Sequence, residues 1–447
     1  MTQKRYFGTD GIRGLVGQAP MTEEWVYRLG RAVGQVIPLQ AKPILIGQDT
    51  RESSDALVNA VASGLASQGH SIILGGVMPT PAVAFLCRQQ NFALGVVVSA
   101  SHNPYHDNGI KFFGSDGFKL SDEAENAIEI AIDDHTAISM STQSGRILSE
   151  HGVVDTYVQH AVRTFFAPQA LAGLELVLDC AHGATYQVAP AVFEALGATV
   201  YPLHVNPDGR NINADCGATH LSALQQAVKE YGVPLGIAFD GDGDRLMMVD
   251  AAGEIVDGDE LLWILATHQL AQHQALPGVV GTLMSNLGLV EALSKCNIPF
   301  YRANVGDRYV LESLQQKQWF LGGESSGHLL HLHYSSTGDG LISALLILQA
   351  ILRAQKPLSE LKKGMYKYPQ VMINVRYEGA KLNLKEAAVQ NAVLAVEQNL
   401  GTQGRVLLRA SGTEPLIRVM VEAKEEALAK TQSQFLADRI QAILAAR

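Results

Sequence analysis

The chain has 447 residues, of which 47% are apolar and 17% charged, and its formal net charge is −10. It is too long for a single hydrophobic core, so about three domains of ordinary size are expected. An acidic chain without a basic stripe is not expected to bind nucleic acid. A membrane partner is not expected either, because the longest apolar stretch, residues 341–352, is too short to span a bilayer.

The cysteines and the amino terminus indicate a cytoplasmic protein. The four cysteines are widely spaced and include no Cys-x-x-Cys pair, which argues against a zinc ribbon and a disulfide framework. Residues 1–5 lead directly into a glycine-rich segment and contain no apolar signal-peptide core. We therefore expect reduced thiols and a cytoplasmic location. The sequence leaves open whether the protein forms a homodimer.

A strand–helix–strand pattern occurs three times along the chain. In the first copy the helix begins at Ser53 or Ser54, both good N-caps, and Leu57, Val61 and Leu65 line one helix face. The three copies cover residues 43–74, 176–201 and 279–301. Any α/β protein produces such units, but the similar turns that end the helices favour duplication. The pattern predicts an α/β fold with three similar mixed α/β domains in tandem.

The pattern changes after Tyr368 and Pro369. Residues 370–377 and 416–422 alternate between apolar and polar like half-exposed strands. Residues 384–400 and 425–444 have apolar residues at helical spacing. This predicts a smaller C-terminal α+β domain, with a hinge near Tyr368. A polar stretch at 136–152 reads as a linker. The predicted domains cover residues 1–152, 153–252, 253–368 and 369–447.

Ser101 lies at the end of a short predicted strand. The β-branched run Val96 to Val98 is typical of a buried strand, and Asn103-Pro104 then starts a turn. In open α/β sheets, ligands bind beyond the carboxyl ends of the strands. Lys111 follows within ten residues and can supply a cation to the same space. By itself this stretch also fits an ordinary turn that leaves the core.

Three aspartates alternate with glycines directly after an apolar segment at 235–239. In an extended backbone the carboxylates of Asp240, Asp242 and Asp244 point to one side, and the glycines let the loop curl. Three such charges repel strongly unless a cation lies among them. Oxygen ligands suit Mg²⁺ or Ca²⁺, and Mg²⁺ commonly keeps a coordination position for a phosphate oxygen. The loop therefore indicates a metal and a phosphorylated ligand, with a solvated acidic turn as the alternative.

A glycine-bounded segment, Gly322 to His328, has the groups that sugar hydroxyls require. Glu324 supplies a carboxylate acceptor, and two serines supply hydroxyls. The last residue, His328, is suited to general acid or base chemistry, although a lone histidine is more often structural. The alternative interpretation is a turn that ends a strand.

A later loop, Arg409 to Pro415, has the composition of a phosphate clamp. Arg409 and Arg418 can make bidentate contacts with a phosphate, and Ser411 and Thr413 add hydroxyl donors. Gly412 permits close approach of the backbone. An ordinary hairpin loop fits this segment equally well.

Five stretches identify a family resemblance that covers the whole chain. They are TDGIRG at 9–14, SASHNPYHDNGIK at 99–111, DGDGDR at 240–245, GGESSGH at 322–328 and RASGTEP at 409–415. The ordered set resembles the α-D-phosphohexomutase family. Within it, YFGTDGIRG at 6–14 and ANVGDRYV at 303–310 are most similar to the bacterial phosphoglucosamine mutase branch. Gln48, where many relatives have arginine, departs from the pattern outside the predicted chemistry.

The resemblance implies a role for each matching residue. Ser101 would be the phosphoserine that transfers its phosphoryl group, and a phosphoserine oxygen would bind Mg²⁺ together with Asp240, Asp242 and Asp244. The transfer centre would be lined by Arg13, His102, Lys111 and Arg245. The sugar would be held by Glu324, Ser326 and His328. The non-reacting phosphate would be held by Arg409, Ser411, Gly412, Thr413 and Arg418.

The implied reaction interconverts glucosamine 6-phosphate and glucosamine 1-phosphate, on the route to UDP-N-acetylglucosamine and cell-wall precursors. A bisphosphate intermediate would turn around in one central cleft formed by all four domains. The basic residues of the protein would be concentrated in this cleft, while the rest of the surface stays acidic. The expected partners are small sugar phosphates, with glucosamine 1,6-bisphosphate or glucose 1,6-bisphosphate as activator. A phosphomannomutase/phosphoglucomutase, a Mg²⁺-dependent sugar phosphatase and a non-catalytic sugar-phosphate sensor remain as alternatives.

Overall fold

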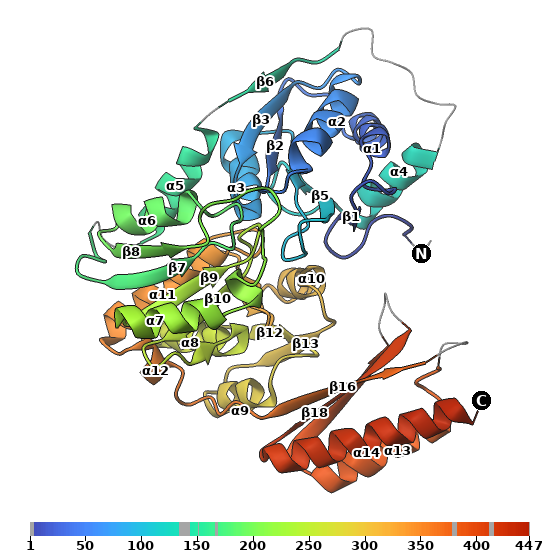
Figure 1. Cartoon of the computed structure of the whole chain (residues 1–447), viewed down its shortest axis with the longest axis vertical. Helices are drawn as coiled ribbons and strands as arrows, with labels where there is room; N and C mark the ends of the chain where they lie inside the picture. Colours follow the sequence, from blue (N-terminus) through green and yellow to red (C-terminus); the bar gives the residue numbers. More distant parts are fainter. Residues whose placement is uncertain are drawn as a thin grey trace. The chain divides into compact units, whose positions relative to one another are not determined.

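The computed structural model of the chain describes residues 4–133, 144–150, 152–165, 169–377, 382–410 and 415–446. The chain forms two compact units, coloured by sequence in Figure 1. The first unit contains Met1–Thr282 and Ala303–Lys362, and the second contains Leu283–Arg302 and Lys363–Arg447. No helix among the described residues has both the length and the apolar character needed to cross a membrane.

The first sheet of the first unit has six strands in the order β1-β5-β4-β2-β3-β6. Its strands are β1 (Ile12–Leu15), β2 (Ile44–Gln48), β3 (Ile72–Val77), β4 (Leu94–Val98), β5 (Asp107–Gly114) and β6 (Ile147–Ser149). β2 is parallel to β3 and β4, whereas β5 is antiparallel to β1 and β4. Every residue of the central β4 is buried, which explains its continuous apolar run.

Four helices accompany this sheet, and two of them pack unusually closely. They are α1 (Glu23–Val36), α2 (Ser54–Ala66), α3 (Thr80–Gln90) and α4 (Asp122–Asp133). Glycines occupy the crossing of α1 and α2, where a Cβ on Gly30 would lie 2.4 Å from the Val61 carbonyl oxygen. A Cβ on Gly64 would lie 2.3 Å from the Tyr27 carbonyl oxygen. The two backbones can therefore touch only because side chains are absent at both positions.

The second sheet has the order β11-β10-β9-β7-β8 and is also mixed. Its strands are β7 (Glu175–Asp179), β8 (Thr199–Leu203), β9 (Leu235–Phe239), β10 (Leu246–Asp250) and β11 (Ile255–Val256). β7 is parallel to β8 and β9, and β10 is antiparallel to β9. The accompanying helices are α5 (Val153–Thr164), α6 (Val188–Ala195), the 3₁₀ turn η1 (Gly217–Thr219) and α7 (Ser222–Tyr231).

A third group of strands completes the first unit. β12 (Val279–Thr282) is parallel to β14 (Leu321–Gly323), which forms an antiparallel hairpin with β15 (Leu329–His331). The helices of this part are α8 (Gly258–Ala271), α10 (Asp307–Lys317), α11 (Gly340–Ala354) and α12 (Leu358–Leu361). Asp339 caps α11, since its carboxylate accepts a hydrogen bond from the Ile342 N–H at 2.9 Å.

The second unit is built on an antiparallel sheet in the order β16-β18-β17. Its elements are α9 (Leu287–Lys295), β16 (Gln370–Arg376), α13 (Ala387–Leu400), β17 (Gly404–Ala410), β18 (Leu416–Ala423) and α14 (Glu426–Ala445). α13 and α14 cover one face of the sheet (Figure 1). Val389, Val419 and Leu436 are fully buried in the core between the helices and the sheet. β13 (Phe300–Ala303) is where the chain returns to the first unit.

The predicted fold class is confirmed: three mixed α/β parts are followed by a smaller part with an antiparallel sheet and helices. The three strand–helix–strand copies correspond to β2-α2-β3, β7-α6-β8 and β12-α9-β13. The division into four domains at 152, 252 and 368 stays a prediction.

One local prediction was wrong in part. Of the predicted linker at 136–152, residues 136–143 and 151 lie outside the described residues, and part of the remainder forms β6, which extends the first sheet in parallel with β3. All three β6 side chains are exposed, and the apolar pair Ile147-Leu148 is too short to show the alternation that would reveal a strand. The hinge near Tyr368 stays a prediction; Tyr368 itself is buried in the second unit, where its backbone N–H and C=O both bond to the Asn286 side chain at 2.9 Å. The chain enters this unit earlier, after Lys362.

Candidate active site

Ser101 lies just beyond the carboxyl end of β4, in the turn toward β5. It is 1% exposed, and its φ of +55° is a left-handed conformation that residues other than glycine seldom adopt. The Ser101 hydroxyl donates a hydrogen bond to Asp240 Oδ2 at 2.7 Å, and its oxygen lies 3.3 Å from His102 Nδ1. The structure therefore brings the serine turn and the aspartate loop into direct contact.

The aspartate loop connects β9 to β10, which pair through Phe239 and Leu246. The side chains of Asp240, Asp242 and Asp244 are buried, and one ligand oxygen of each lies within 4.8 Å of the others. Gly241 is needed for the approach to the serine turn, because a Cβ there would lie only 2.5 Å from the Ser101 carbonyl oxygen. The extended spacing of the carboxylates thus produces one compact oxygen cluster.

Lys111, on β5, is the cation at the centre of this cluster. Its Nζ lies 2.7 Å from Asp242 Oδ2, 2.9 Å from Asp10 Oδ2 and 3.4 Å from Asp244 Oδ2. Burial alone would lower the pKa of Lys111, but Asp10 and the two loop aspartates raise that pKa well above its usual range. Burial and the neighbouring carboxylates in turn raise the pKa of Asp240 well above normal. The cluster therefore holds more negative charge than one lysine neutralises.

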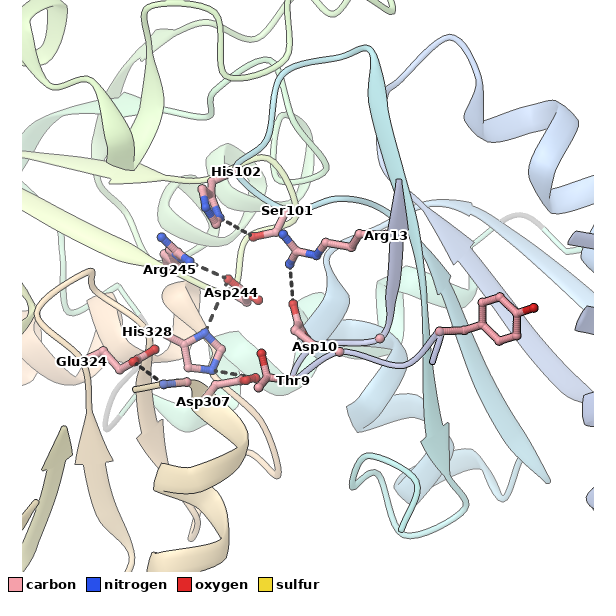
Figure 2. Close-up of a pocket in the computed structure, with 14 residues that line it drawn as sticks. Thr9, Asp10, Arg13, Ser101, His102, Asp244, Arg245, Asp307, Glu324 and His328 are labelled. Carbon is pink, nitrogen blue, oxygen red and sulfur yellow. Dashed lines mark hydrogen bonds and ion pairs between the residues drawn. The ribbon is translucent and has the colours of Figure 1, made fainter. Parts of the chain in front are cut away.

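A pocket of about 380 Å³ opens beside Ser101 (Figure 2). Its walls come from the first glycine-rich loop, the serine turn, the aspartate loop and the third part of the first unit. The lining residues are Tyr6, Gly8, Thr9, Asp10, Gly11, Arg13, Ser101, His102, Asp244, Arg245, Gly306, Asp307, Glu324 and His328. Four of the predicted motifs thus contribute to one pocket in the first unit.

Glu324 and His328 face this pocket from the hairpin between β14 and β15. Glu324 Oε1 accepts a hydrogen bond from the Gly306 N–H at 3.0 Å. The His328 ring lies between two carboxylates, with Nδ1 3.5 Å from Asp244 Oδ1 and Nε2 3.7 Å from Asp307 Oδ2. Burial opposes its charge, but Asp244 and then Asp307 raise the pKa of His328 to about 9. His328 is therefore a cation at neutral pH. Ser326, which was also predicted to bind the sugar, lies in the same hairpin but does not line the pocket.

Two arginines and a histidine surround the Ser101 hydroxyl. Arg13 donates to Asp10 Oδ2 at 2.5 Å and to the Ala100 carbonyl at 3.2 Å. Arg245 Nε lies 4.0 Å from carboxylate oxygens of both Asp240 and Asp244. Burial, followed by the guanidinium groups of Arg245 and Arg13, lowers the pKa of His102 to about 4. His102 is therefore neutral near pH 7 and can accept a proton.

Sequence reasoning missed three charged residues beside the pocket: Asp10, Lys119 and Asp307. Lys119 Nζ bonds to Asp10 Oδ1 at 2.6 Å and also to Asp307 Oδ2. Asp10 belongs to the TDGIRG motif at 9–14, in which Arg13 alone was predicted to be a site residue. The cleft was expected to be rich in cations, and this expectation is met only in part. Four carboxylates line the pocket, those of Asp10, Asp244, Asp307 and Glu324, against three cations, Arg13, Arg245 and His328.

The predicted phosphate clamp lies in the second unit. Arg409 on β17 and Arg418 on β18 are directly opposite in the antiparallel register. Like charges at such positions repel, so they favour an anion nearby. Arg418 Nε is buried and has no hydrogen-bond partner among the described residues. Ser411, Gly412 and Thr413, which were predicted to complete the clamp, lie outside the described residues.

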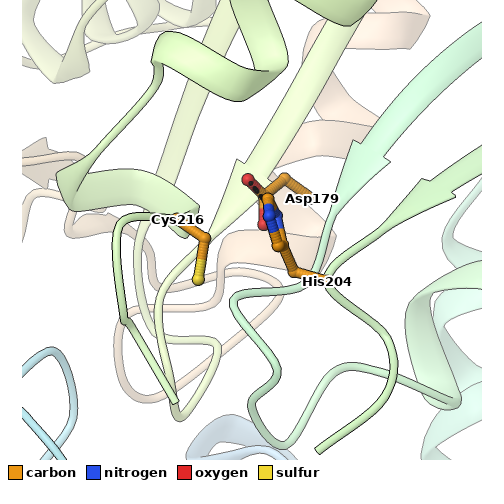
Figure 3. Close-up of side chains that lie close together, drawn as sticks. All are labelled: Asp179, His204 and Cys216. Carbon is orange, nitrogen blue, oxygen red and sulfur yellow. Dashed lines mark ion pairs between the residues drawn. The ribbon is translucent and has the colours of Figure 1, made fainter. Parts of the chain in front are cut away.

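A second cluster of possible metal ligands lies at the ends of β7 and β8 and consists of Asp179, His204 and Cys216 (Figure 3). Asp179 already accepts hydrogen bonds from the Ala181 N–H at 2.9 Å and the Gly217 N–H at 3.0 Å. His204 Nδ1 lies 3.0 Å from the same carboxylate. Burial, followed by the nearby aspartates, raises the pKa of the Cys216 thiol to about 12, which disfavours the thiolate. We interpret this cluster as an anchor for the surrounding loops.

Comparison with known protein families gives matches along nearly the whole chain. Models of the phosphoglucomutase/phosphomannomutase family match as α/β/α domain I at residues 4–138, domain II at 155–253, domain III at 257–368 and the C-terminal domain at 372–439. The chain belongs to the phosphoglucomutase/phosphomannomutase family. It is therefore a phosphohexomutase, an enzyme of the isomerase class.

Individual relatives of this phosphohexomutase agree with that assignment. The phosphoglucosamine mutase of Aeromonas hydrophila is 49% identical over 439 residues, which cover 98% of this chain and 99% of that protein. A phosphoglucomutase/phosphomannomutase family protein from Burkholderia thailandensis has the same fold, with a TM-score of 0.80, 24% identity and coverage of 99% and 98% of the two chains. The N-acetylphosphoglucosamine mutase of Aspergillus fumigatus, solved with GlcNAc-6P and magnesium, has a TM-score of 0.67, 17% identity and coverage of 99% and 96%.

Proposed function

We propose that this phosphohexomutase is a phosphoglucosamine mutase, which interconverts glucosamine 6-phosphate and glucosamine 1-phosphate. The observation that carries the proposal is the contact between the Ser101 hydroxyl and Asp240, next to a pocket that also contains Glu324 and His328. A nucleophilic hydroxyl, a set of oxygen ligands and a group of sugar-hydroxyl partners converge there. The 49% identity to a phosphoglucosamine mutase over nearly the whole chain supports the amino-sugar substrate.

The three loop aspartates fit Mg²⁺. Their ligand atoms are close together, all are oxygens, and Asp242 Oδ1 and Asp244 Oδ1 are buried without hydrogen-bond partners among the described residues. The excess of carboxylates over cations also favours a divalent ion. In this proposal Asp240, Asp242 and Asp244 hold the ion with an oxygen of phosphorylated Ser101. When bound, the ion would neutralise charge on the transferring phosphoryl group.

In the forward direction, phosphorylated Ser101 transfers its phosphoryl group to O1 of glucosamine 6-phosphate. The bond between phosphorus and Ser101 Oγ breaks and a bond between phosphorus and O1 forms. The O1 proton passes to the departing Ser101 Oγ, which restores the serine hydroxyl. Arg13 and Arg245 are placed to stabilise charge on the phosphoryl oxygens, and most of the catalysis is positioning and electrostatics. The product of this step is the 1,6-bisphosphate.

The bisphosphate then turns around, so that its 6-phosphate faces Ser101. The Ser101 oxygen attacks that phosphorus, the bond to O6 breaks, and glucosamine 1-phosphate leaves. The serine hydroxyl proton, which is donated to Asp240 Oδ2 in the structure, passes to the departing O6, so the serine and the sugar exchange phosphoryl group and proton. Glu324 and the protonated His328 can bind sugar hydroxyls in either orientation, while Arg409, Arg418 and the 411–413 segment bind the phosphate that is not reacting.

The proposal is tested by steady-state rates with the 6-phosphates of glucosamine, N-acetylglucosamine and glucose and with mannose 1-phosphate, each started with a trace of glucose 1,6-bisphosphate. We expect turnover of the glucosamine phosphate to exceed the others. Comparable rates on glucose and mannose phosphates would instead support a phosphomannomutase/phosphoglucomutase. Release of inorganic phosphate at the rate of sugar-phosphate consumption would support a phosphatase.

Three finer expectations belong to the same proposal. Glucosamine 1,6-bisphosphate or glucose 1,6-bisphosphate is the proposed activator, because it can rephosphorylate a bare Ser101. A cytoplasmic location is supported by four free cysteines, three of them buried. Whether the protein forms a homodimer stays open, and sedimentation equilibrium would decide it.

A further inference from the structure

The Ser101 turn has to be held in place by its surroundings. A serine with φ of +55° is in a left-handed conformation that persists only where neighbouring groups enforce it. The turn contains no regular secondary structure between β4 and β5, so its carbonyl groups need donors from elsewhere. Those donors identify the part of the protein that sets the position of the serine.

The main donor is Arg51, which follows β2. Because β2 and β4 are parallel and Gln48 pairs with Val98, their carboxyl ends meet at the same edge of the sheet. Arg51 therefore begins directly beside the serine turn. Its side chain is fully buried, as is that of its ion-pair partner Asp49. A buried arginine pair of this kind is stable only if its remaining donors find acceptors.

All five N–H donors of Arg51 have acceptors, and four of the acceptors are carbonyls of the serine turn. Nη2 donates to the Ser101 carbonyl at 3.0 Å and to the Asn103 carbonyl at 2.8 Å. Nη1 donates to the Asp107 carbonyl at 3.0 Å and to the Pro104 carbonyl. Nε donates to Asp49 Oδ2 at 2.8 Å. One rigid guanidinium thus fixes the turn from Ser101 to its end at β5.

Two further groups hold the same turn from other directions. The Ser99 hydroxyl donates to Asp49 Oδ2 at 2.6 Å and accepts from the Ser101 N–H at 2.9 Å, which links Asp49 to the serine backbone. Asn213 Nδ2 donates to the Ser101 carbonyl at 2.9 Å and to the Asn103 carbonyl at 3.2 Å. Both peptide groups of Ser101 are therefore fixed.

We propose that Arg51 is a positioning residue for phosphoryl transfer: with Asp49, it clamps the serine turn and aims the Ser101 oxygen at the substrate. This inference rests on the proposed function of Ser101 as phosphoryl carrier. Arg51 does not line the pocket, and Asp49 neutralises its charge locally, so its effect is geometric. Lysine keeps the charge but has only three donors and no planar fork, so it cannot hold four carbonyls.

The test is the Arg51→Lys variant, assayed well below its unfolding temperature. We expect kcat to fall about 10- to 100-fold, the penalty for a small misplacement of reacting groups, while KM stays nearly unchanged. The rate at which glucose 1,6-bisphosphate phosphorylates Ser101, followed by intact mass, should fall by a similar factor. Wild-type kcat and wild-type phosphorylation rate in this variant would overturn the inference.

A matched control is Arg405→Lys, in the second unit. Arg405 also forms a fork, to Glu422 and to the carbonyls of Leu283 and Ser285 at 2.8 Å, and all of these partners belong to the second unit. We expect this variant to lose thermal stability with kcat close to wild type. Equal losses of kcat in both variants would mean that Arg51 acts only on folding, which would overturn the inference.

Two gentler variants decide the matter if Arg51→Lys does not fold. Ser99→Ala removes the link from Asp49 to the Ser101 N–H, and Asn213→Ala removes donors to the Ser101 and Asn103 carbonyls. Each should lower kcat more than it raises KM, and wild-type kcat in both would overturn the proposal. If the wild type itself fails to interconvert glucosamine phosphates, the proposed function fails, and the Ser101 phosphorylation rates still test the clamp.

Discussion

Replacing Lys111 by methionine tests the charge balance of the site. Methionine keeps an unbranched apolar side chain but removes the ammonium that lies 2.7 Å from Asp242 and 2.9 Å from Asp10. Lys111 is 1% exposed, so water cannot replace it easily. Removing one partner of a buried ion pair costs about 3–5 kcal/mol of stability. Here three carboxylates lose that partner together, so we expect the upper part of this range in the absence of Mg²⁺.

Mg²⁺ should offset part of this loss. The variant gains one unit of net negative charge beside the three loop aspartates, so its affinity for Mg²⁺ should rise. If the dissociation constant falls about tenfold, a near-saturating Mg²⁺ concentration adds about 1.4 kcal/mol of stabilisation over that of the wild type. The two effects have opposite signs and are therefore easy to separate.

Urea unfolding with and without Mg²⁺ measures both effects. The three tryptophans, Trp25, Trp263 and Trp319, all belong to the first unit, so their fluorescence reports on the unit that contains the site. Lys119→Met is the matched control, because Lys119 is mostly buried and contacts Asp10 and Asp307 but none of the loop aspartates. Equal Mg²⁺ effects in both variants, or a loss below about 1 kcal/mol in Lys111→Met, would refute this reasoning.

Three other substitutions give further tests. Asp339 accepts a hydrogen bond from the Tyr157 hydroxyl, and burial raises the pKa of Asp339 to about 6. Protonation of Asp339 therefore stabilises the fold below about pH 4, and this stabilisation is lost as the pH rises through 6. Between pH 4 and 7 the free energy of unfolding of the wild type, measured by urea titration, should fall by about 3 kcal/mol relative to that of Asp339→Asn. A difference in unfolding free energy that does not change with pH would contradict this. Gly241→Ala would press a Cβ against the Ser101 carbonyl, so kcat should fall more than about tenfold; unchanged turnover would disprove that close approach. Arg418→Ala should raise KM about tenfold or more for both glucosamine 6-phosphate and glucosamine 1-phosphate, and an effect on only one of them would contradict binding in two orientations.

The sequence predicts those parts of the site that are continuous along the chain. The stretch around Ser101 fits an ordinary turn by itself, and Ser101 could be identified only from the aspartate loop, the sugar loop and the arginine clamp elsewhere in the sequence. The aspartate loop could be identified because its charges alternate with glycines within five residues. The same holds for most of the fold, because the apolar periods of elements such as β4 and α2 are strong and their helix caps are recognisable.

The remaining parts depend on contacts between residues far apart in sequence. Arg51 reads as an ordinary loop residue until β2 and β4 are known to be neighbours. Lys119 and Asp307 meet only because separate parts of the first unit fold together. β6 was missed because edge strands with exposed side chains have no apolar alternation. Short-range patterns contain none of this information.

The central claim is that Ser101 carries the phosphoryl group. The most direct measurement is intact-mass analysis of the purified protein after incubation with glucose 1,6-bisphosphate, followed by peptide mapping. We predict the gain of one phosphate, located on Ser101, and its loss to the sugar when excess glucosamine 6-phosphate is added. Phosphate on any other residue, or full turnover by Ser101→Ala, would contradict the account.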